Sequence, residues 1–103
     1  MSDELFWDLA DEMRAADSAL SEGTIMSSRC LRLNGDFLAM PHHKRDGLVV
    51  KLPASRVAEL VASGTGEPFA PAGRVFKKWV AIPKLDEELW RSLLTESKAF
   101  VGP

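Results

Sequence analysis

The sequence predicts a single α+β domain spanning residues 1–103, with elements in the order α-β-β-β-α-β-α. Three observations predict this class. Apolar residues recur at helical spacing near both ends of the chain, an Asn-Gly pair separates two alternating runs within residues 31–40, and residues 48–60 follow the pattern strand, proline, helix. Short connections between the first three strands favour a twisted antiparallel sheet, with the helices packed mainly on one face.

A first helix is predicted from Ser2, whose hydroxyl can cap it, with Asp3 and Glu4 in its first turn. Gly23 is expected to end it. The predicted buried stripe of this helix consists of Leu5, Leu9, Met13, Ala16 and Leu20, widened by Phe6.

Asn34-Gly35 predicts a two-residue hairpin turn, because both central positions of a type I′ turn require a positive φ. In that register Leu33 faces Asp36 and Leu31 faces Leu38. The core side is then expected to carry Leu31, Leu33, Leu38 and Met40, and the other side Cys30, Arg32, Phe37 and Ala39.

The next segment predicts a third strand over Leu48–Leu52 and a helix that starts at Pro53, since proline fits the first turn of a helix. Gly64 is the expected helix stop, and residues 64–73 are expected to form a loop held to the core by Phe69. The predicted buried face of this helix consists of Val57, Leu60 and Val61.

A fourth strand is predicted over Trp79–Ile82, where Pro83 ends it. Asp86 is then placed to cap a closing helix. The residues of that helix expected to face the core are Leu89, Trp90, Leu93, Leu94 and Phe100.

Composition indicates an ordinary globular protein, with 46% apolar and 27% charged residues. No apolar run reaches the roughly 20 residues that a membrane-spanning helix needs. The acidic start at Asp3 and Glu4 does not resemble a secretory signal, so we expect a cytoplasmic protein without a membrane association. The single cysteine, Cys30, excludes an internal disulfide.

Charge is distributed unevenly along the chain. Residues 1–22 carry seven acids and one base, a net −6, whereas residues 23–84 carry ten bases and four acids, a net +6. A basic central region can attract phosphate or an acidic partner. The alternatives are that the acidic first helix packs near it, or that both are solvated surfaces.

Several segments carry a family likeness. They are Leu48–Pro53, Arg56–Leu60, Gly64, Glu67–Phe69, Gly73-Arg74 and Trp79-Val80, together with Cys30–Arg32, Gly35 and Phe37. In these positions the chain resembles the TfoX N-terminal-domain family, over nearly its whole length. The resemblance implies a small domain similar to the MmcQ/YjbR-like fold. Named members of that family regulate natural competence together with a cyclic-AMP-receptor-type activator. They carry a second, C-terminal domain, whereas this chain ends at Pro103, and many have a glycine pair where this chain has Met26-Ser27-Ser28.

No segment predicts catalysis, a metal site or a cofactor. His42 and His43 are adjacent and would point in opposite directions from an extended chain, so one metal ion could not readily use both. Cys30 and His42 are expected on opposite faces of the hairpin, which argues against a nucleophile–base pair. Gly64-Thr65-Gly66 follows a helix, whereas a phosphate-binding loop precedes one.

Two basic segments are the candidate contact sites. The first is the expected hairpin tip His42, His43, Lys44 and Arg45, and the second is Arg74, Lys77 and Lys78, which surround Phe76 and lead into Trp79. Our leading hypothesis is a non-enzymatic regulatory or interaction domain with a protein partner, either monomeric or a homodimer. The alternative is a nucleic-acid-binding module that uses these two segments, since cations interleaved with aromatic residues suit phosphate contacts and base stacking.

Overall fold

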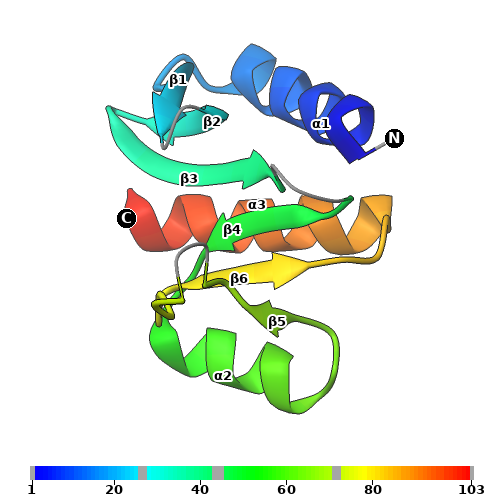
Figure 1. Cartoon of the computed structure of the whole chain (residues 1–103). Helices are drawn as coiled ribbons and strands as arrows, with labels where there is room; N and C mark the ends of the chain where they lie inside the picture. The colour runs from blue at the N-terminus through cyan, green and yellow to red at the C-terminus, as the bar shows by residue number, and fades with distance from the viewer. Residues whose placement is uncertain (1, 26–27, 43–45, 71–72, 103) are drawn as a thin grey trace.

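The computed structural model describes residues 2–25, 28–42, 46–70 and 73–102. Its centre is a six-stranded antiparallel sheet with the strand order β1-β2-β3-β4-β6-β5 (Figure 1). The strands are β1 Leu20–Ile25, β2 Ser28–Leu33, β3 Asp36–Pro41, β4 Leu48–Lys51, β5 Glu67–Pro68 and β6 Trp79–Ile82. The α+β class and the antiparallel sheet are therefore as predicted, while the full order is α-β-β-β-β-α-β-β-α.

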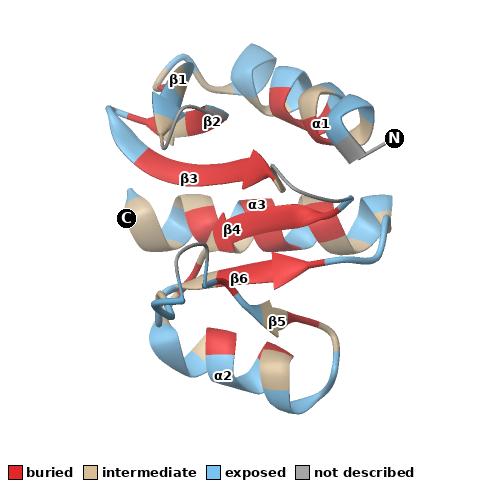
Figure 2. Ribbon diagram, viewed as in Figure 1, coloured by how far each residue is buried: buried red, intermediate tan, exposed pale blue. Residues whose placement is uncertain are grey.

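Three helices pack against this sheet: α1 Ser2–Ala16, α2 Ala54–Ala62 and α3 Glu87–Val101. Helix α3 crosses β3 and β4, α1 contacts β1 and β3, and α2 lies at the β5–β6 edge (Figure 1). All three contribute to one hydrophobic core, in which Phe6, Leu60 and Trp90 are almost completely buried. Figure 2 shows the central strands buried and the outer surfaces of the helices exposed. Among the described residues, no helix is long and apolar enough to cross a membrane.

A second, smaller cluster covers the opposite face of the sheet. Its buried members are Cys30, Phe37, Met40, Val49, Phe69 and Ala81. Phe69 comes from the connection between β5 and β6, and Phe76 and Trp79 pack against the cluster from the same part of the chain. The face without helices is thus covered in part by aromatic side chains of that connection.

The first helix is shorter than predicted. It ends at Ala16, and the Asp17 carboxylate accepts a hydrogen bond of 2.9 Å from the Ala19 amide, which turns the chain into β1. Leu20 is therefore the start of a strand rather than the last helical residue, and it pairs with Leu33. The helical spacing of the apolar residues continued past the true end, and pairing with β2 decided the structure instead.

The sequence predicted that Gly23 ends the first helix, and this prediction is wrong. Gly23 lies in the middle of β1, opposite Cys30. A Cβ atom at this position would lie 2.4 Å from Nε of Arg32. The Arg32 side chain occupies that space and donates hydrogen bonds to the carbonyl oxygens of Thr24 (2.5 Å) and Gly35 (3.1 Å). Glycine is therefore needed here because an arginine crosses the strand, not because a helix stops.

The Asn34-Gly35 turn is confirmed, with φ values of 51° and 88°. Leu33 pairs with Asp36 and Arg32 with Phe37, as predicted. Beyond them the register shifts, so that Leu31 pairs with Ala39 rather than with Leu38. Such a bulge reverses the alternation of the strand.

The bulge moves two residues of β3 to the faces opposite those predicted. Ala39 belongs to the main core and Met40 to the second cluster. Cys30 and Phe37 lie in the second cluster, as expected for the side without helices. Nothing in the local sequence distinguishes the bulged strand from a regular one.

The strand–proline–helix segment is confirmed. Pro53 is the N-cap of α2, the helix ends at Ala62 with Ser63 as its C-cap, and Gly64 follows with a φ of 80°. Asp86 caps α3 by accepting a hydrogen bond of 3.1 Å from the Leu89 amide. The predicted loop after Gly64 contains one more element, β5, whose two residues pair with β6 at the edge of the sheet. Proline is tolerated at such an edge.

Candidate functional site

The segment from Arg74 to Lys78 is held in place by backbone hydrogen bonds although most of its side chains are exposed. The Phe76 amide donates to the carbonyl oxygen of Phe69 (3.0 Å), and the carbonyl oxygen of Lys78 accepts from the Leu52 amide (2.8 Å). These bonds connect the segment to the loop after β5 and to the residue after β4. The exposed side chains therefore project from a defined backbone.

Stacked aromatic rings pack the same segment against the sheet. The Trp79 ring stacks on Phe37 at a centroid distance of 4.3 Å and on Phe69 at 5.6 Å. Phe76 packs against Trp79 at 5.0 Å. Because the rings engage one another, these aromatics chiefly anchor the segment to the sheet.

Between this segment and α2 lies an apolar hollow of about 440 Å³, which we call the α2 groove. Its lining residues are Ala54, Val57, Ala58, Val61, Ala62, Pro68, Val75, Phe76 and Lys77. Val75 is 55% exposed, the highest exposure recorded for a large hydrophobic side chain among the described residues. An exposed apolar surface of this kind is typical of interaction sites.

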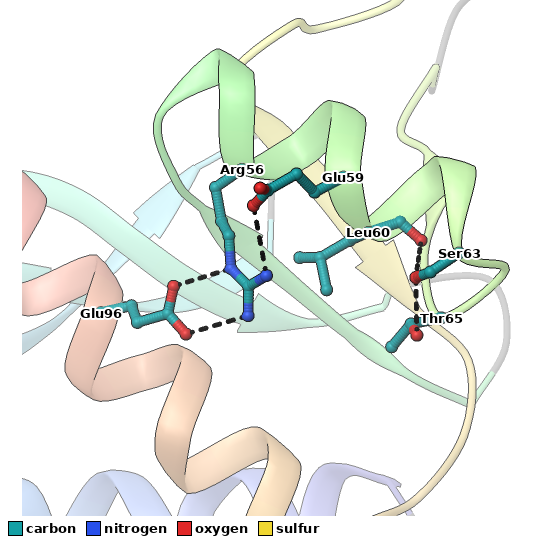
Figure 3. A network of polar contacts seen from close by, with 6 residues as sticks. All are labelled: Arg56, Glu59, Leu60, Ser63, Thr65 and Glu96. Carbon is teal, nitrogen blue, oxygen red and sulfur yellow. Dashed lines mark hydrogen bonds and ion pairs between the residues drawn. The ribbon is translucent and has the colours of Figure 1, made fainter.

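An ion pair joins α2 to α3 (Figure 3). The Arg56 guanidinium donates to both carboxylate oxygens of Glu96 on α3, at 2.9 and 3.3 Å, and also to Glu59 at 3.4 Å. The hydrogen bond to Glu96 raises the pKa of Arg56 above its ordinary value. With Arg56 directed toward α3 and Leu60 in the core, the alanines Ala54 and Ala58 are left on the outer surface.

The carboxyl end of α2 is closed by side-chain hydroxyls. Ser63 Oγ donates to the carbonyl oxygen of Leu60 at 3.1 Å and lies 3.0 Å from Thr65 Oγ1 (Figure 3). Gly64-Thr65-Gly66 is accordingly a turn, as expected. In it Gly66 is packed so closely that an added Cβ would lie 2.6 Å from Val80.

A second hollow of about 560 Å³, which we call the cationic basin, adjoins the groove and shares Val75, Phe76 and Lys77 with it. Its complete lining is Lys51, Arg74, Val75, Phe76, Lys77, Lys78 and Trp79. No carboxylate is found among the described residues that line either hollow. The four cations of the basin are Lys51, Arg74, Lys77 and Lys78, and none of them takes part in an ion pair recorded between described residues. The predicted basic segment is thus the shared wall of two hollows.

The first predicted contact segment is described only in part. His42 is half-buried, with its ring edge-on to Phe69 at 5.8 Å, and its amide donates to the carbonyl oxygen of Gly47 at 2.9 Å. His43, Lys44 and Arg45 lie outside the described residues. Phe69 also contacts Phe76, so His42 reaches the same aromatic cluster that anchors the second basic segment.

Glu12 and Asp17 form ion pairs with residues outside the basin. On α1, Glu12 accepts hydrogen bonds from Arg91 of α3 at 3.0 and 3.2 Å, which lower the pKa of Glu12. Lys98 of α3 lies 2.8 Å from the Asp17 carboxylate, whose pKa it lowers together with the Ala19 amide. Glu12 on α1 and Asp17 directly after it therefore pair with α3 rather than with Arg74, Lys77 and Lys78.

Cys30 is completely buried in the second cluster. Within the described ranges, no group of three or more His, Cys, Asp or Glu residues could hold a metal ion.

The α2 groove was not predicted from the sequence. Val61 was expected to be buried, yet it is half-exposed and lines the groove. Phe100 was expected to face the core but is half-buried, with Nζ of Lys78 lying 6.0 Å from its ring centroid. The signal for the groove was present in the spacing of Ala54, Ala58 and Val61, which widens the apolar face of α2 beyond the buried residues Val57 and Leu60.

Comparisons of the chain with protein-family models, with curated proteins and with solved structures found no match.

Proposed function

We propose that this domain is a non-enzymatic, cytoplasmic interaction module that binds a protein partner through the α2 groove. The observation that carries the proposal is the groove itself, an apolar hollow beside an ordered segment whose side chains remain exposed. A binding surface that is largely pre-formed loses little conformational entropy when a partner docks. The resemblance to the N-terminal domain of competence regulators also supports a regulatory role, because those regulators act together with a protein partner.

Site-specific photo-cross-linking tests the proposal. A benzoylphenylalanine replaces Ala58 in the groove, and a control variant carries the same group in place of Ala15, which is also an exposed helical alanine but lies on α1. In the native cells, irradiation is expected to give discrete protein adducts from position 58 that position 15 does not give. A second substitution, Val75→Glu, places a charge on the groove wall and is expected to abolish those adducts.

The adducts would refute the proposal if they were the same from both positions, or if Val75→Glu left the adducts of position 58 unchanged. Circular dichroism of each variant establishes that the fold is retained. Sedimentation of the purified chain separates monomer from homodimer, and adducts between two copies would identify the groove as a dimer contact.

A second candidate function is nucleic-acid binding, favoured by the four cations of the basin, Lys51, Arg74, Lys77 and Lys78. Phosphate contacts of this kind weaken steeply as salt rises. Stacking of bases has less support, because Trp79 is already stacked on Phe37 and Phe69. Titration with single-stranded and duplex oligonucleotides tests this function, with salt-dependent NMR shifts expected at Arg74–Trp79. No shifts at high oligonucleotide concentration would reject it.

A further inference from the structure

We infer that the occupant of the α2 groove is an amphipathic helix with acidic residues along one flank. This inference rests on the proposed interaction function and specifies the chemistry of the partner. It follows from the shape of the groove, the charge beside it, and the secondary structure at its edge.

The groove suits an apolar helical stripe. One wall is α2, which is nine residues long and presents Ala54, Ala58 and Ala62 to the outside. Residues spaced by four form one ridge of a helix, and small side chains on that ridge let a second helix approach closely. The other wall, Val75–Lys77, supplies larger side chains that can pack beside a bound helix.

Charge restricts the partner further. Lys77 lies on the groove wall, and the basin beyond it adds Lys51, Arg74 and Lys78. Glu59, the acid of α2, forms an ion pair with Arg56. A bound helix with carboxylates beside Lys77 is therefore attracted by these cations, and a helix with cations at the same place is repelled by them.

An added strand fits this edge less well than a helix does. Strand addition needs a row of free backbone groups on an edge strand. Here the edge strand is β5, which has only two residues, and Pro68 has no amide hydrogen to donate. Recognition of a helix in a groove uses side chains instead, and these are what the site provides.

A second copy of the described chain is a poor occupant. Its acidic helix, α1, already buries its apolar stripe, with Phe6, Leu9 and Ala10 at 0–3% exposure. Helix α1 could present acids together with apolar side chains only by leaving its own core. Helix α3, which carries Glu87 and Glu88 in its first turn, likewise buries its apolar residues Trp90, Leu93 and Leu94. The occupant is thus a segment of a different protein.

Two model peptides test the inference on the full chain. Each has about 18 residues, or about five helical turns, with leucines at positions i, i+4, i+7 and i+11. One carries glutamates on both flanks and the other carries lysines at the same positions. We expect the acidic peptide to bind about tenfold more tightly or better at low salt, with the difference shrinking as salt rises. Its NMR shifts are expected at Ala54–Ala62 and Val75–Lys77.

Charge reversal at the site provides the matched comparison. In Arg74→Glu/Lys77→Glu the preference between the peptides should disappear or invert. In Lys84→Glu, which alters an exposed lysine outside both hollows, the preference should remain. Circular dichroism again confirms the fold of each variant.

Equal affinity for the two peptides, binding of neither at about 1 mM, or shifts confined to other surfaces would each overturn the inference. Shifts at Arg74–Trp79 caused by an oligonucleotide but by neither peptide would overturn it in favour of nucleic acid. If Ala58 cross-links a partner while the peptides show no preference, the interaction function stands and only the acidic helix is wrong. If position 58 gives no specific adduct, the proposed function itself fails.

Discussion

Substitution of Gly23 by alanine is expected to destabilise the protein when Arg32 is present. The same substitution is expected to stabilise the protein when Arg32 is replaced by alanine. In the wild-type background the new Cβ would lie 2.4 Å from Nε and 2.6 Å from Cδ of Arg32. The guanidinium must therefore leave its place across β1, where it donates to the carbonyl oxygens of Thr24 and Gly35. The three heavy atoms nearest to that Cβ all belong to Arg32, so removal of the arginine side chain removes the closest contacts.

The magnitude follows from two opposing effects. Hydrogen bonds from a charged donor are worth about 1.5–3 kcal/mol each when fully buried, and this half-exposed side chain can recover much of that from water. We expect a loss of about 1–2 kcal/mol. Alanine in place of glycine also gains about 0.4–1 kcal/mol, because the unfolded chain becomes less flexible. Gly23→Ala should thus destabilise the wild type by about 1 kcal/mol, and should stabilise Arg32→Ala by about 0.5 kcal/mol.

Urea unfolding of the wild type, the two single variants and the double variant measures this cycle. For a chain of this size, 1 kcal/mol corresponds to a change in Tm of roughly 4–6 °C. The reasoning is wrong if Gly23→Ala costs the same free energy in both backgrounds. That result would mean that Gly23 is required for its own backbone conformation and not for the passage of Arg32.

Three further predictions follow from the packing and the charges. Leu94→Ala removes a completely buried side chain of α3 and should lower the free energy of unfolding by about 2–5 kcal/mol in a urea titration; a change below about 1 kcal/mol would contradict the described core. Arg56→Ala and Glu96→Gln should show a coupling of only about 0.5–1 kcal/mol in a double-mutant cycle, because both side chains are 37% exposed. Each substitution should also weaken partner binding at the α2 groove. Unchanged affinity would show that the ion pair does not affect binding at the groove. Lys98 and the Ala19 amide lower the pKa of Asp17 below its ordinary value of 3.8, so the Asp17 carboxylate contributes its full stabilisation above pH 3.8 and loses it as the pH falls through the lowered pKa. The Asp17→Asn variant should therefore be less acid-sensitive than the wild type in pH-dependent thermal unfolding. Identical acid profiles of the two proteins would exclude this contribution.

Local patterns predicted the elements whose cause is local. The Asn34-Gly35 turn follows from the positive φ that both residues tolerate, and the start of α2 directly after Pro53, its N-cap, follows from the fixed φ of proline. The cap at Asp86 likewise depends on a single hydrogen bond within the first turn of α3. Such features need no knowledge of distant residues, which explains why the sequence was sufficient for them.

The wrong predictions concern features that distant residues decide. Gly23 was assigned to a helix end because its partner Arg32 is nine residues away and on another strand. The faces of Ala39 and Met40 depended on a bulge that appears only when β2 and β3 are paired.

The chain by itself determined the α+β class, the hairpin, the two helix starts and the basic character of Arg74, Lys77 and Lys78. Only the tertiary structure placed those cations beside an apolar groove on α2. The reason is physical: the apolar face of α2 is wider than the core can cover, and the packing of Val57 and Leu60 in the core leaves the stripe with Ala54 and Ala58 outside. The stripe left outside is the surface that we propose as the binding site.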